Sequence, residues 1–277
     1  MRLAYFGTPE MAVSPLRALV AAGHDVALVV TRVDKRRGRG SELSPSPVKA
    51  AALEHGVPVT HSVDDVLGRE IELGVVVAFG QLIKPHVLAE VPMVNMHFSL
   101  LPRWRGAAPV ERALLAGDTE TGVCLMRLEE GLDTGPIYDT VRLPIAETAT
   151  AGDLRRDLVA IGTEQLIRCL AAPLPRPVPQ EGKPVYAAKL RTEELRIDWS
   201  RPVEDIDRLV RLGGAWTTFR SKRLKVLRVA LHDAGAASPE RPVPGLRLVT
   251  VQPEGKGPMP YADFARGARP QNDEMFE

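Results

Sequence analysis

The run Leu-Gly-Val-Val-Val-Ala-Phe at residues 73–79 is the feature that most constrains the fold of this chain. It is almost continuously apolar, which is typical of a strand in a parallel sheet whose two faces are both covered by helices. Strand-like and helix-like segments alternate around it over the first 170 residues, and this alternation predicts right-handed βαβ units. The sequence therefore predicts an α/β fold, with a Rossmann-like, mostly parallel sheet and helices on both faces.

The predicted elements follow from apolar runs and from the residues that begin and end helices. Thr8, followed by Pro9, is expected to cap a helix that ends at Gly23. Ser46, followed by Pro47, is expected to cap a second helix. Two further helices are predicted over residues 107–116 and 153–170. Strands are predicted over residues 3–6, 26–30, 57–60, 73–79, 92–96, 121–128 and 137–143.

The chain changes character after residue 171. Proline occupies every second position from Pro173 to Pro179, which excludes a helix and predicts an extended, stiff linker over residues 172–196. Beyond it, the pattern predicts a small β-barrel or open sheet, and the residues after Pro260 are polar, with an end expected to be poorly ordered. Its short strands are expected over residues 216–219, 224–229 and 246–251. We therefore divide the chain into residues 1–171, 172–196 and 197–277.

Composition narrows the class of protein. Of the 277 residues, 44% are hydrophobic and 26% are charged, as in globular enzymes, and the formal net charge is +1. A polyanionic partner would therefore have to be met by local basic patches. Cys124 and Cys169 form no Cys-x-x-Cys pair, the start has no signal-peptide pattern, and no apolar run reaches the roughly 18 residues of a membrane span. We expect a cytoplasmic protein that does not contact a membrane.

Glycine patterns argue against a nicotinamide or flavin cofactor. The turn Gly7-Thr8-Pro9-Glu10 has one glycine, not the Gly-x-Gly-x-x-Gly of dinucleotide sites. Pro9 also lacks the amide that a phosphate would need there. Gly38-Arg39-Gly40 lacks the third glycine as well and lies in a charged loop.

Asn95 and His97 lie at the end of a predicted buried strand and point to the same face, because side chains alternate along a strand. In open α/β sheets, ligands bind at this edge. An amide can hold a developing oxyanion, an imidazole can donate to it or shuttle a proton, and the carboxylate of Asp133 can tune the imidazole. The trio points to acyl transfer to an amine, and no nucleophilic Ser or Cys is indicated. Taken alone, Asp133 also fits a turn residue before Gly135.

A basic loop at residues 34–40 contains Arg36, Arg37 and Arg39 between the second strand and the following helix. It leaves the same edge of the sheet as the polar pair at the end of the buried strand. Its glycines would let the cations press against phosphates, but a solvated loop explains such a run equally well.

Further basic residues stand elsewhere in the chain. Arg105, beside Trp104, fits either a base-stacking platform or a packed rim. Lys222 and Lys225 belong to a second basic group, in the predicted β domain. If both basic groups face one cleft, they could hold a nucleic acid across two domains.

These motifs resemble those of the methionyl-tRNA formyltransferases, within the family of formyltransferases that use 10-formyltetrahydrofolate. The matching segments NMHFSLLP (95–102) and LDTG (132–135) are specific for formyl transfer from this folate. The segments RGRGSELSPSPVK (37–49), PRWRGAAP (102–109) and VQPEGK (251–256) point to the tRNA enzyme. The resemblance extends along nearly the whole chain.

The resemblance implies a monomeric enzyme that formylates the α-amino group of methionine on initiator methionyl-tRNA, for translation initiation. The co-substrate would be 10-formyltetrahydrofolate, without a metal. Catalytic roles are implied for Asn95, His97 and Asp133. Folate contacts are implied for Phe79, Gly80, Ser99, Leu100, Leu101 and Pro102. Contacts with tRNA are expected at Arg36, Arg37, Arg39, Arg105, Lys222 and Lys225, and the C-terminal domain should be OB-like.

The C-terminal domain is expected to be shorter than is usual in this family. Only Leu212-Gly213-Gly214-Ala215 separates Arg211 from Trp216, and residues 232–245 form an Ala/Pro-rich link where the family has further strands. A sheet that lacks strands would be open, with an exposed edge. Two alternatives stay open: an N-formyltransferase for a small amine such as an amino sugar nucleotide, and a non-catalytic paralogue that binds tRNA or folate.

Overall fold

The computed structural model describes residues 1–36, 43–231, 242–271, 274 and 276. Arg37 and Arg39, which were predicted to bind tRNA, lie outside the described residues. The chain forms two compact units. Unit 1 comprises Met1–Pro109, Glu120–Pro144 and Arg155–Ala188, and unit 2 comprises Val110–Thr119, Ile145–Leu154 and Lys189–Glu277. The division at residues 171 and 196 stays a prediction.

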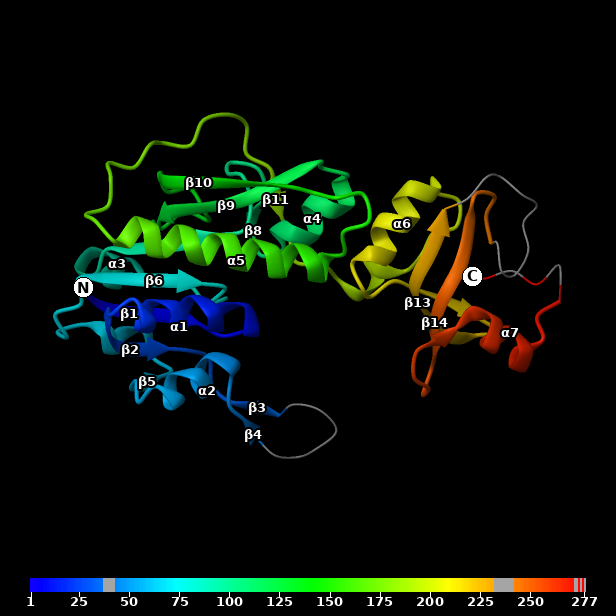
Figure 1. Ribbon diagram of the computed structural model, residues 1–277, viewed down its shortest axis with the longest axis horizontal. Coiled ribbons are helices and arrows are strands. Elements are labelled where there is room, and N and C mark those ends of the chain that lie inside the picture. The colour runs from blue at the N-terminus through cyan, green and yellow to red at the C-terminus, as the bar shows by residue number, and fades with distance from the viewer. Residues whose placement is uncertain (37–42, 232–241, 272–273, 275, 277) are drawn as a thin grey trace. The chain divides into compact units, whose positions relative to one another are not determined.

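Unit 1 is built on a seven-stranded sheet in the order β10-β9-β7-β6-β1-β2-β5 (Figure 1). Strands β5, β2, β1, β6 and β7 run parallel, whereas β9 and β10 join antiparallel at one edge. The prediction of an α/β fold with a mostly parallel sheet is confirmed. The strands are β1 (Arg2–Gly7), β2 (Asp25–Val30), β5 (Val59–Thr60), β6 (Leu73–Val77), β7 (Met93–His97), β9 (Glu120–Arg127) and β10 (Ile137–Pro144).

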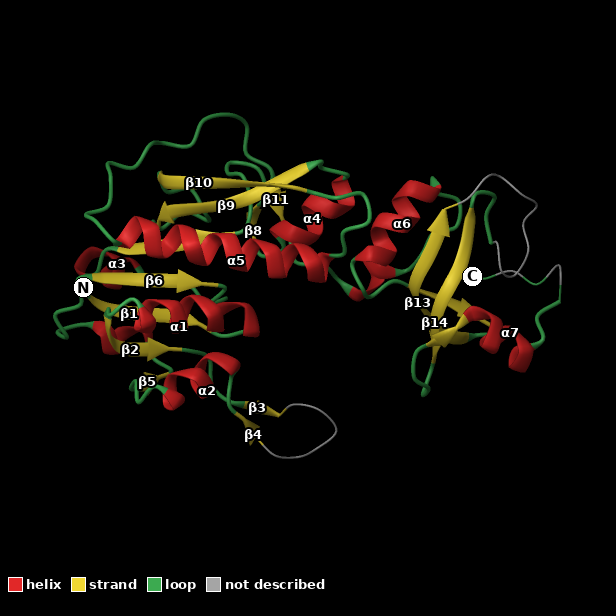
Figure 2. Cartoon of the chain, in the orientation of Figure 1, coloured by secondary structure: helices red, strands yellow, loops and turns green. Residues whose placement is uncertain are grey.

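Helices cover both faces of this sheet (Figure 2). On one face, Phe6 of β1 packs in a cluster with Val66 and Val87 from the short helices η2 and α3. On the other face, Gly162 lies so close to the sheet that a Cβ there would be 3.1 Å from Val123. The helices of the first 170 residues are η1 (Glu10–Ala12), α1 (Val13–Ala21), α2 (Pro47–Glu54), η2 (Val63–Val66), α3 (Pro85–Glu90), α4 (Pro109–Ala116) and α5 (Ala151–Leu170).

The two predicted helix caps have different outcomes. Ser46 caps α2 as predicted, because its hydroxyl accepts from the amide of Lys49 at 3.0 Å. The prediction for Thr8 is wrong: Pro9 is extended, a 3-10 turn follows, and α1 begins only at Val13. Thr8 instead uses its hydroxyl to tie the ends of neighbouring strands together, donating to the carbonyl of Phe79 at 3.4 Å.

The proline-rich segment is extended, as its pattern predicts. Val178 and Ile137 exchange two backbone hydrogen bonds of 2.8 Å, so this segment runs antiparallel beside the start of β10. Further on, β11 (Tyr186–Ala187) pairs in parallel with β8 (Arg105–Gly106), which follows the loop after β7. The segment therefore returns to the carboxyl end of the sheet.

Unit 2 contains an antiparallel sheet of four strands in the order β12-β13-β14-β15. Ile206 and Val210 of α6 are buried in one apolar cluster with Leu224, Val226 and Leu248 of the sheet. The predicted C-terminal β domain is thus present as a sheet with its own core. Its elements are η3 (Thr192–Leu195), α6 (Val203–Arg211), β12 (Trp216–Phe219), β13 (Lys222–Leu231), β14 (Leu246–Pro253), β15 (Met259–Pro260) and α7 (Tyr261–Ala268).

The tail after Pro260 contains a helix that the sequence pattern did not predict, while the expectation of poor order at its very end stays a prediction. Helix α7 follows Pro260 directly, and Phe264 in that helix packs on Phe219 at 5.5 Å between ring centroids. Phe276, near the end of the chain, is buried and lies 5.4 Å from the same ring of Phe219. Aromatic contacts with Phe219 therefore hold Phe264 and Phe276 of the tail against the sheet of unit 2.

Candidate active site

Strand β7 joins the parallel part of the sheet to its antiparallel edge, and it carries Asn95 and His97. Asn95 lies opposite Val76 of β6 and Met126 of β9, and His97 ends the strand opposite Cys124. Both side chains are buried, with exposed fractions of 9% and 5%. A buried polar group needs a hydrogen-bond partner, so the groups that bond to Asn95 and His97 are the other members of the site.

Asp133, in the loop between β9 and β10, brings its carboxylate to both residues. Its Oδ1 accepts from Nδ2 of Asn95 at 3.4 Å, and its Oδ2 lies 3.6 Å from Nδ1 of His97. Oδ2 also accepts from the backbone amide of Gly106 at 2.7 Å. The three residues for which catalytic roles were predicted therefore meet in one buried cluster.

The contacts of His97 decide where its proton lies. Nε2 is 2.9 Å from the carbonyl oxygen of Trp104. A carbonyl can only accept, so the hydrogen-bond network assigns a hydrogen to Nε2. In the neutral ring, Nδ1 then has a lone pair that faces Oδ2 of Asp133, and these two acceptors form a hydrogen bond only when the ring gains a second proton. Nδ1 is therefore placed to accept a proton, and Asp133 is placed to stabilise the protonated ring.

Cys124, opposite His97 in the sheet, is a poor nucleophile. Burial raises the pKa of its thiol above the ordinary value, and a hydrogen bond with Thr140 only partly opposes this effect. The reactive thiolate is therefore scarce at neutral pH. What the cluster offers chemically is an amide donor, a proton-accepting imidazole and a carboxylate, which suits direct acyl transfer between two bound substrates.

The residues with implied folate contacts form the turn after β7. Ser99 is fully buried, and its hydroxyl donates to the backbone carbonyl four residues later at 2.7 Å. Leu100 is half-buried and Leu101 is buried. The carbonyl of Pro102 accepts from the amide of Val185 at 3.2 Å, which ties the turn to the segment returning from the linker.

Phe79 and Gly80 follow β6, the neighbour of β7. The ring of Phe79 lies in the core, edge-on to Phe6 with 5.6 Å between ring centroids. Gly80 is exposed, and its carbonyl accepts from the guanidinium of Arg32 at 2.7 Å. Their roles in folate binding stay a prediction.

Arg105, expected at a tRNA contact, hydrogen-bonds with Gln180 beside the trio, and its contact with tRNA stays a prediction. Its Nε and Nη2 donate to Oε1 of Gln180 at 3.1 and 2.7 Å. Nε2 of Gln180 in turn donates to the carbonyls of Asp133 and Gly135, both at 2.8 Å. Gln180 belongs to no motif and lies in the proline-rich segment, so sequence reasoning missed it. The carbonyl of Trp104 was missed because main-chain groups leave no signature in a sequence.

The other predicted tRNA-binding residues lie on both units. Arg36 pairs with Leu43 through the backbone, in the two-stranded sheet of β3 (Lys35–Arg36) and β4 (Leu43–Ser44) of unit 1. Lys222 and Lys225 are exposed on β13 of unit 2. Their role in binding stays a prediction.

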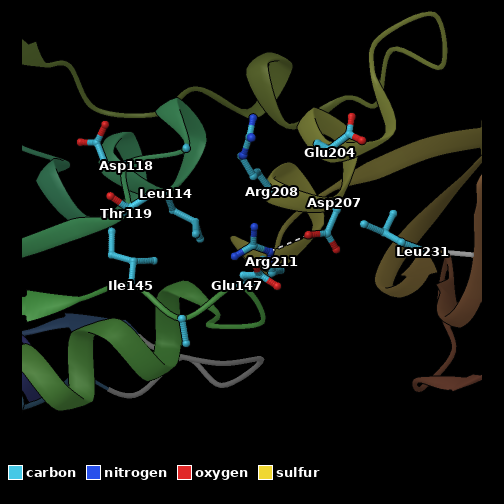
Figure 3. A pocket seen from close by; sticks show the side chains of 12 residues that line it. Leu114, Asp118, Thr119, Ile145, Glu147, Glu204, Asp207, Arg208, Arg211 and Leu231 are labelled. Carbon is cyan, nitrogen blue, oxygen red and sulfur yellow. Dashed lines mark hydrogen bonds and ion pairs between the residues drawn. The ribbon is translucent and has the colours of Figure 1, made fainter.

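Unit 2 has a pocket of about 320 Å³, which is separate from the trio (Figure 3). Two arginines of α6 point into it, but both are occupied: Arg211 pairs with Asp207 at 2.7 Å, and Arg208 pairs with Asp205 at 2.8 Å. Four carboxylates and two guanidinium groups line the pocket, so it has no excess of positive charge for an anion. It is lined by Leu114, Gly117, Asp118, Thr119, Ile145, Ala146, Glu147, Glu204, Asp207, Arg208, Arg211 and Leu231.

The described residues contain neither a membrane-spanning helix nor a cluster of metal ligands. None of their helices is both long and apolar enough to cross a membrane. Within the same residues, His, Cys, Asp and Glu side chains form no group of three or more that could hold a metal ion.

Family models match both parts of this chain, and relatives match it along its whole length. The family model described as formyl transferase matches residues 1–170, and the model of the formyl transferase C-terminal domain matches residues 189–247. A methionyl-tRNA formyltransferase of Roseobacter denitrificans is 40% identical over 305 residues, covering 100% of this chain and 99% of the relative. That of Thermobifida fusca is 43% identical over 309 residues, covering 100% and 99%.

Solved structures share the fold at low identity. The methionyl-tRNA formyltransferase from Clostridium thermocellum superposes with a TM-score of 0.65 at 15% identity, over 93% of this chain and all of the other. WlaRD, a sugar 3N-formyl transferase, gives 0.70 at 19% identity over 93% and 99%. By family models over most of its length and by sequence identity over its whole length, this chain belongs to the formyl transferase family and to its methionyl-tRNA formyltransferase branch.

Proposed function

We propose that the chain transfers the formyl group of 10-formyltetrahydrofolate to the α-amino group of methionine on initiator methionyl-tRNA. The observation that carries this proposal is the buried convergence of Asn95, His97 and Asp133 on a chain whose relatives are methionyl-tRNA formyltransferases. The chain is a formyl-transferring enzyme by family. The trio supplies the groups that such a transfer needs at the reacting carbon.

In the proposed reaction, the α-amino nitrogen attacks the formyl carbon and forms a new C–N bond, while negative charge develops on the carbonyl oxygen. Asn95 donates to this oxyanion from Nδ2, and the positive charge of His97, protonated at Nδ1 beside Asp133, stabilises it. The bond from the formyl carbon to N10 then breaks, and the proton lost by the amine passes to N10. Asp133 orients His97 and stabilises its protonated form during this transfer.

The co-substrate is folate-derived in this family, and we assign its contacts to two neighbouring strand ends. The turn from Ser99 to Pro102 would lie along the folate, and the main chain at Phe79 and Gly80 would meet the pterin. The exposed cations Lys222 and Lys225 would contact tRNA phosphates. Because its product serves translation initiation, we place the enzyme in the cytoplasm, and we propose that it acts as a monomer.

The proposal is tested by formylation of methionyl initiator tRNA with purified protein and 10-formyltetrahydrofolate. We expect turnover by the wild type and a loss of at least about 10²-fold in kcat for His97→Ala, since its role lies in the transition state. His86→Ala is the matched control, because that exposed ring pairs with the surface carboxylate of Asp64, which is not part of the trio. It should retain wild-type turnover.

Other outcomes of this assay identify the alternatives. Turnover with amino sugar nucleotides but not with tRNA would favour formylation of a small amine. Salt-sensitive binding of tRNA without any turnover would favour a non-catalytic binder. Near-normal turnover of His97→Ala would remove His97 from the mechanism.

A further inference from the structure

Gln180 connects three parts of the site that are distant in the sequence. It lies in the extended segment after α5, 47 residues beyond Asp133 and 75 beyond Arg105. Its Nε2 donates to the main-chain carbonyls of Asp133 and Gly135, and its Oε1 accepts from both Nε and Nη2 of Arg105. Both amide hydrogens and both lone pairs of Gln180 are therefore used, so its orientation is fixed.

The loop held by Gln180 needs such a support. Asp133 is in the left-handed backbone region, with φ of 50°, which an L-residue adopts at a cost. Its carboxylate points inward to the amide of Gly106 and to His97, while its carbonyl is bound by Gln180. One residue is thus anchored through its side chain and its main chain at the same time.

Arg105 completes the arrangement. It directly precedes Gly106, whose amide binds the carboxylate of Asp133 at 2.7 Å. Arg105 therefore contributes through its guanidinium, which orients Gln180, and through the adjoining peptide, which binds Asp133. The half-buried guanidinium has a structural partner, which accounts for an arginine here independently of tRNA.

We propose that Gln180 is a positioning residue for Asp133, held in place by Arg105, so that the linker segment sets the geometry of the reacting groups. This inference rests on the proposed function, in which Asp133 serves His97. Groups that orient a catalytic residue typically contribute about 10- to 100-fold to activity, and a displacement of about 1 Å has a comparable effect. We therefore expect the effect to fall on kcat.

The experiment compares steady-state formylation by the wild type, Gln180→Ala and Gln180→Glu. The Glu variant keeps an acceptor for Arg105 but loses both N–H donors, so the loop should be released in both variants. We expect kcat to fall about 10- to 100-fold in each, with KM for the folate nearly unchanged. Gln165→Ala is the matched control: this buried glutamine also donates from Nε2 to a main-chain carbonyl, that of Val123, but it does not contact Asp133.

A double-mutant cycle separates positioning from general loosening of the fold. If Gln180 acts through Asp133, then adding Gln180→Ala to Asp133→Ala should lower kcat by less than about 2-fold beyond the single Asp133→Ala variant. Fully multiplicative losses would overturn the inference, because Gln180 would then act independently of Asp133. Wild-type kcat in both Gln180 variants would overturn it as well.

These outcomes are distinct from failure of the proposed function. If the wild type does not formylate tRNA, or if Asp133→Ala is fully active, the proposed function fails. If the wild type is active, Asp133→Ala is impaired and both Gln180 variants are normal, only the role of Gln180 fails. Should Gln180→Ala not fold, Gln180→Glu alone completes the cycle, because its side chain has nearly the same volume.

Discussion

Trp104 and Asp133 face the two nitrogens of the His97 ring, and both adopt left-handed backbone conformations although neither is a glycine. The φ angle is 66° at Trp104 and 50° at Asp133. The first directs a carbonyl to Nε2 of His97, and the second carries the carboxylate that faces Nδ1. Such conformations cost on the order of 1–3 kcal/mol each and persist only where the surrounding structure holds them. The two strained residues hold the His97 ring in one orientation, and this backbone strain is the energetic cost of orienting a reacting group.

In the loop that carries Asp133, Gly135 has the least space for an added side chain. A Cβ at Gly135 would lie 2.0 Å from the backbone carbonyl oxygen of Arg127, which cannot rotate away as a flexible side chain could. We expect Gly135→Ala to displace the loop of Asp133, to lower kcat by about 10²-fold and to destabilise the fold by roughly 1–3 kcal/mol. Formylation kinetics and urea unfolding measure the two effects.

Gly257→Ala is the control for that substitution, because nothing lies within 4 Å of the Cβ that it would add. It should match the wild type in kcat and in unfolding midpoint. If Gly135→Ala were equally silent, the position of the loop would not limit turnover.

Sequence reasoning reached part of the site because local rules govern that part. Alternation along one strand is enough to place Asn95 and His97 on the same face. The partners of Asp133 follow no local rule: the amide of Gly106 and the side chain of Gln180 are 27 and 47 residues away in the sequence. Only the path of the folded chain brings the amide of Gly106 to the carboxylate of Asp133 and the side chain of Gln180 to its main-chain carbonyl.

At the level of elements, helix starts show how tertiary contacts override a local signal. Thr8 and Ser46 both precede a proline, which is a common pattern at helix N-termini. Only Ser46 caps its helix, because the hydroxyl of Thr8 hydrogen-bonds with the neighbouring strand ends instead. Helix α7 was missed for a related reason: the aromatic ring that packs on its Phe264 is Phe219 of β12, far away in the sequence.

Ser46 provides a test at this scale. Its buried hydroxyl accepts from the amide of Lys49 at 3.0 Å and pairs with the hydroxyl of Thr31 at 2.8 Å. Ser46→Ala leaves both partners buried without their hydrogen bond, so we expect a loss of about 1–3 kcal/mol in the free energy of unfolding. Urea titration measures it. Ser14→Ala, exposed in the first turn of α1, should change it by less than about 0.5 kcal/mol, and equal losses would contradict the cap.

At the scale of the whole molecule, the chain divides into two compact units, each with its own sheet. The C-terminal domain is compact: α6 passes to β12 through a short turn in which Gly213 has φ of 88°. Alignment with the Roseobacter relative runs over 305 residues, more than the 277 of this chain, so the relative has additional residues.

The fold class of the chain was predictable from the sequence, because hydrophobic periodicity is a local property. The complete core of the C-terminal sheet was not predictable, because Phe276 and α6 contribute to it from outside the strands.

To act on tRNA, a chain of net charge +1 has to bind a polyanion. Binding must come from local cations, since the molecule has no overall attraction for tRNA. Lys222 and Lys225 are exposed on the same strand, β13. If each neutralises one phosphate, replacing both by Gln should raise KM for tRNA and reduce the slope of log affinity against log salt by about 2, with KM for folate unchanged.

The matched control removes two positive charges elsewhere, in Arg17→Gln with Arg69→Gln. Arg17 of α1 pairs with Glu54 of α2, and Arg69 is exposed in the segment after η2. The change in net charge is the same, so a general electrostatic effect would alter both salt slopes alike. A slope that changes only in the β13 variant would assign tRNA contact to this strand. An unchanged slope in that variant would exclude it, and the contacts would then have to come from the basic residues of unit 1.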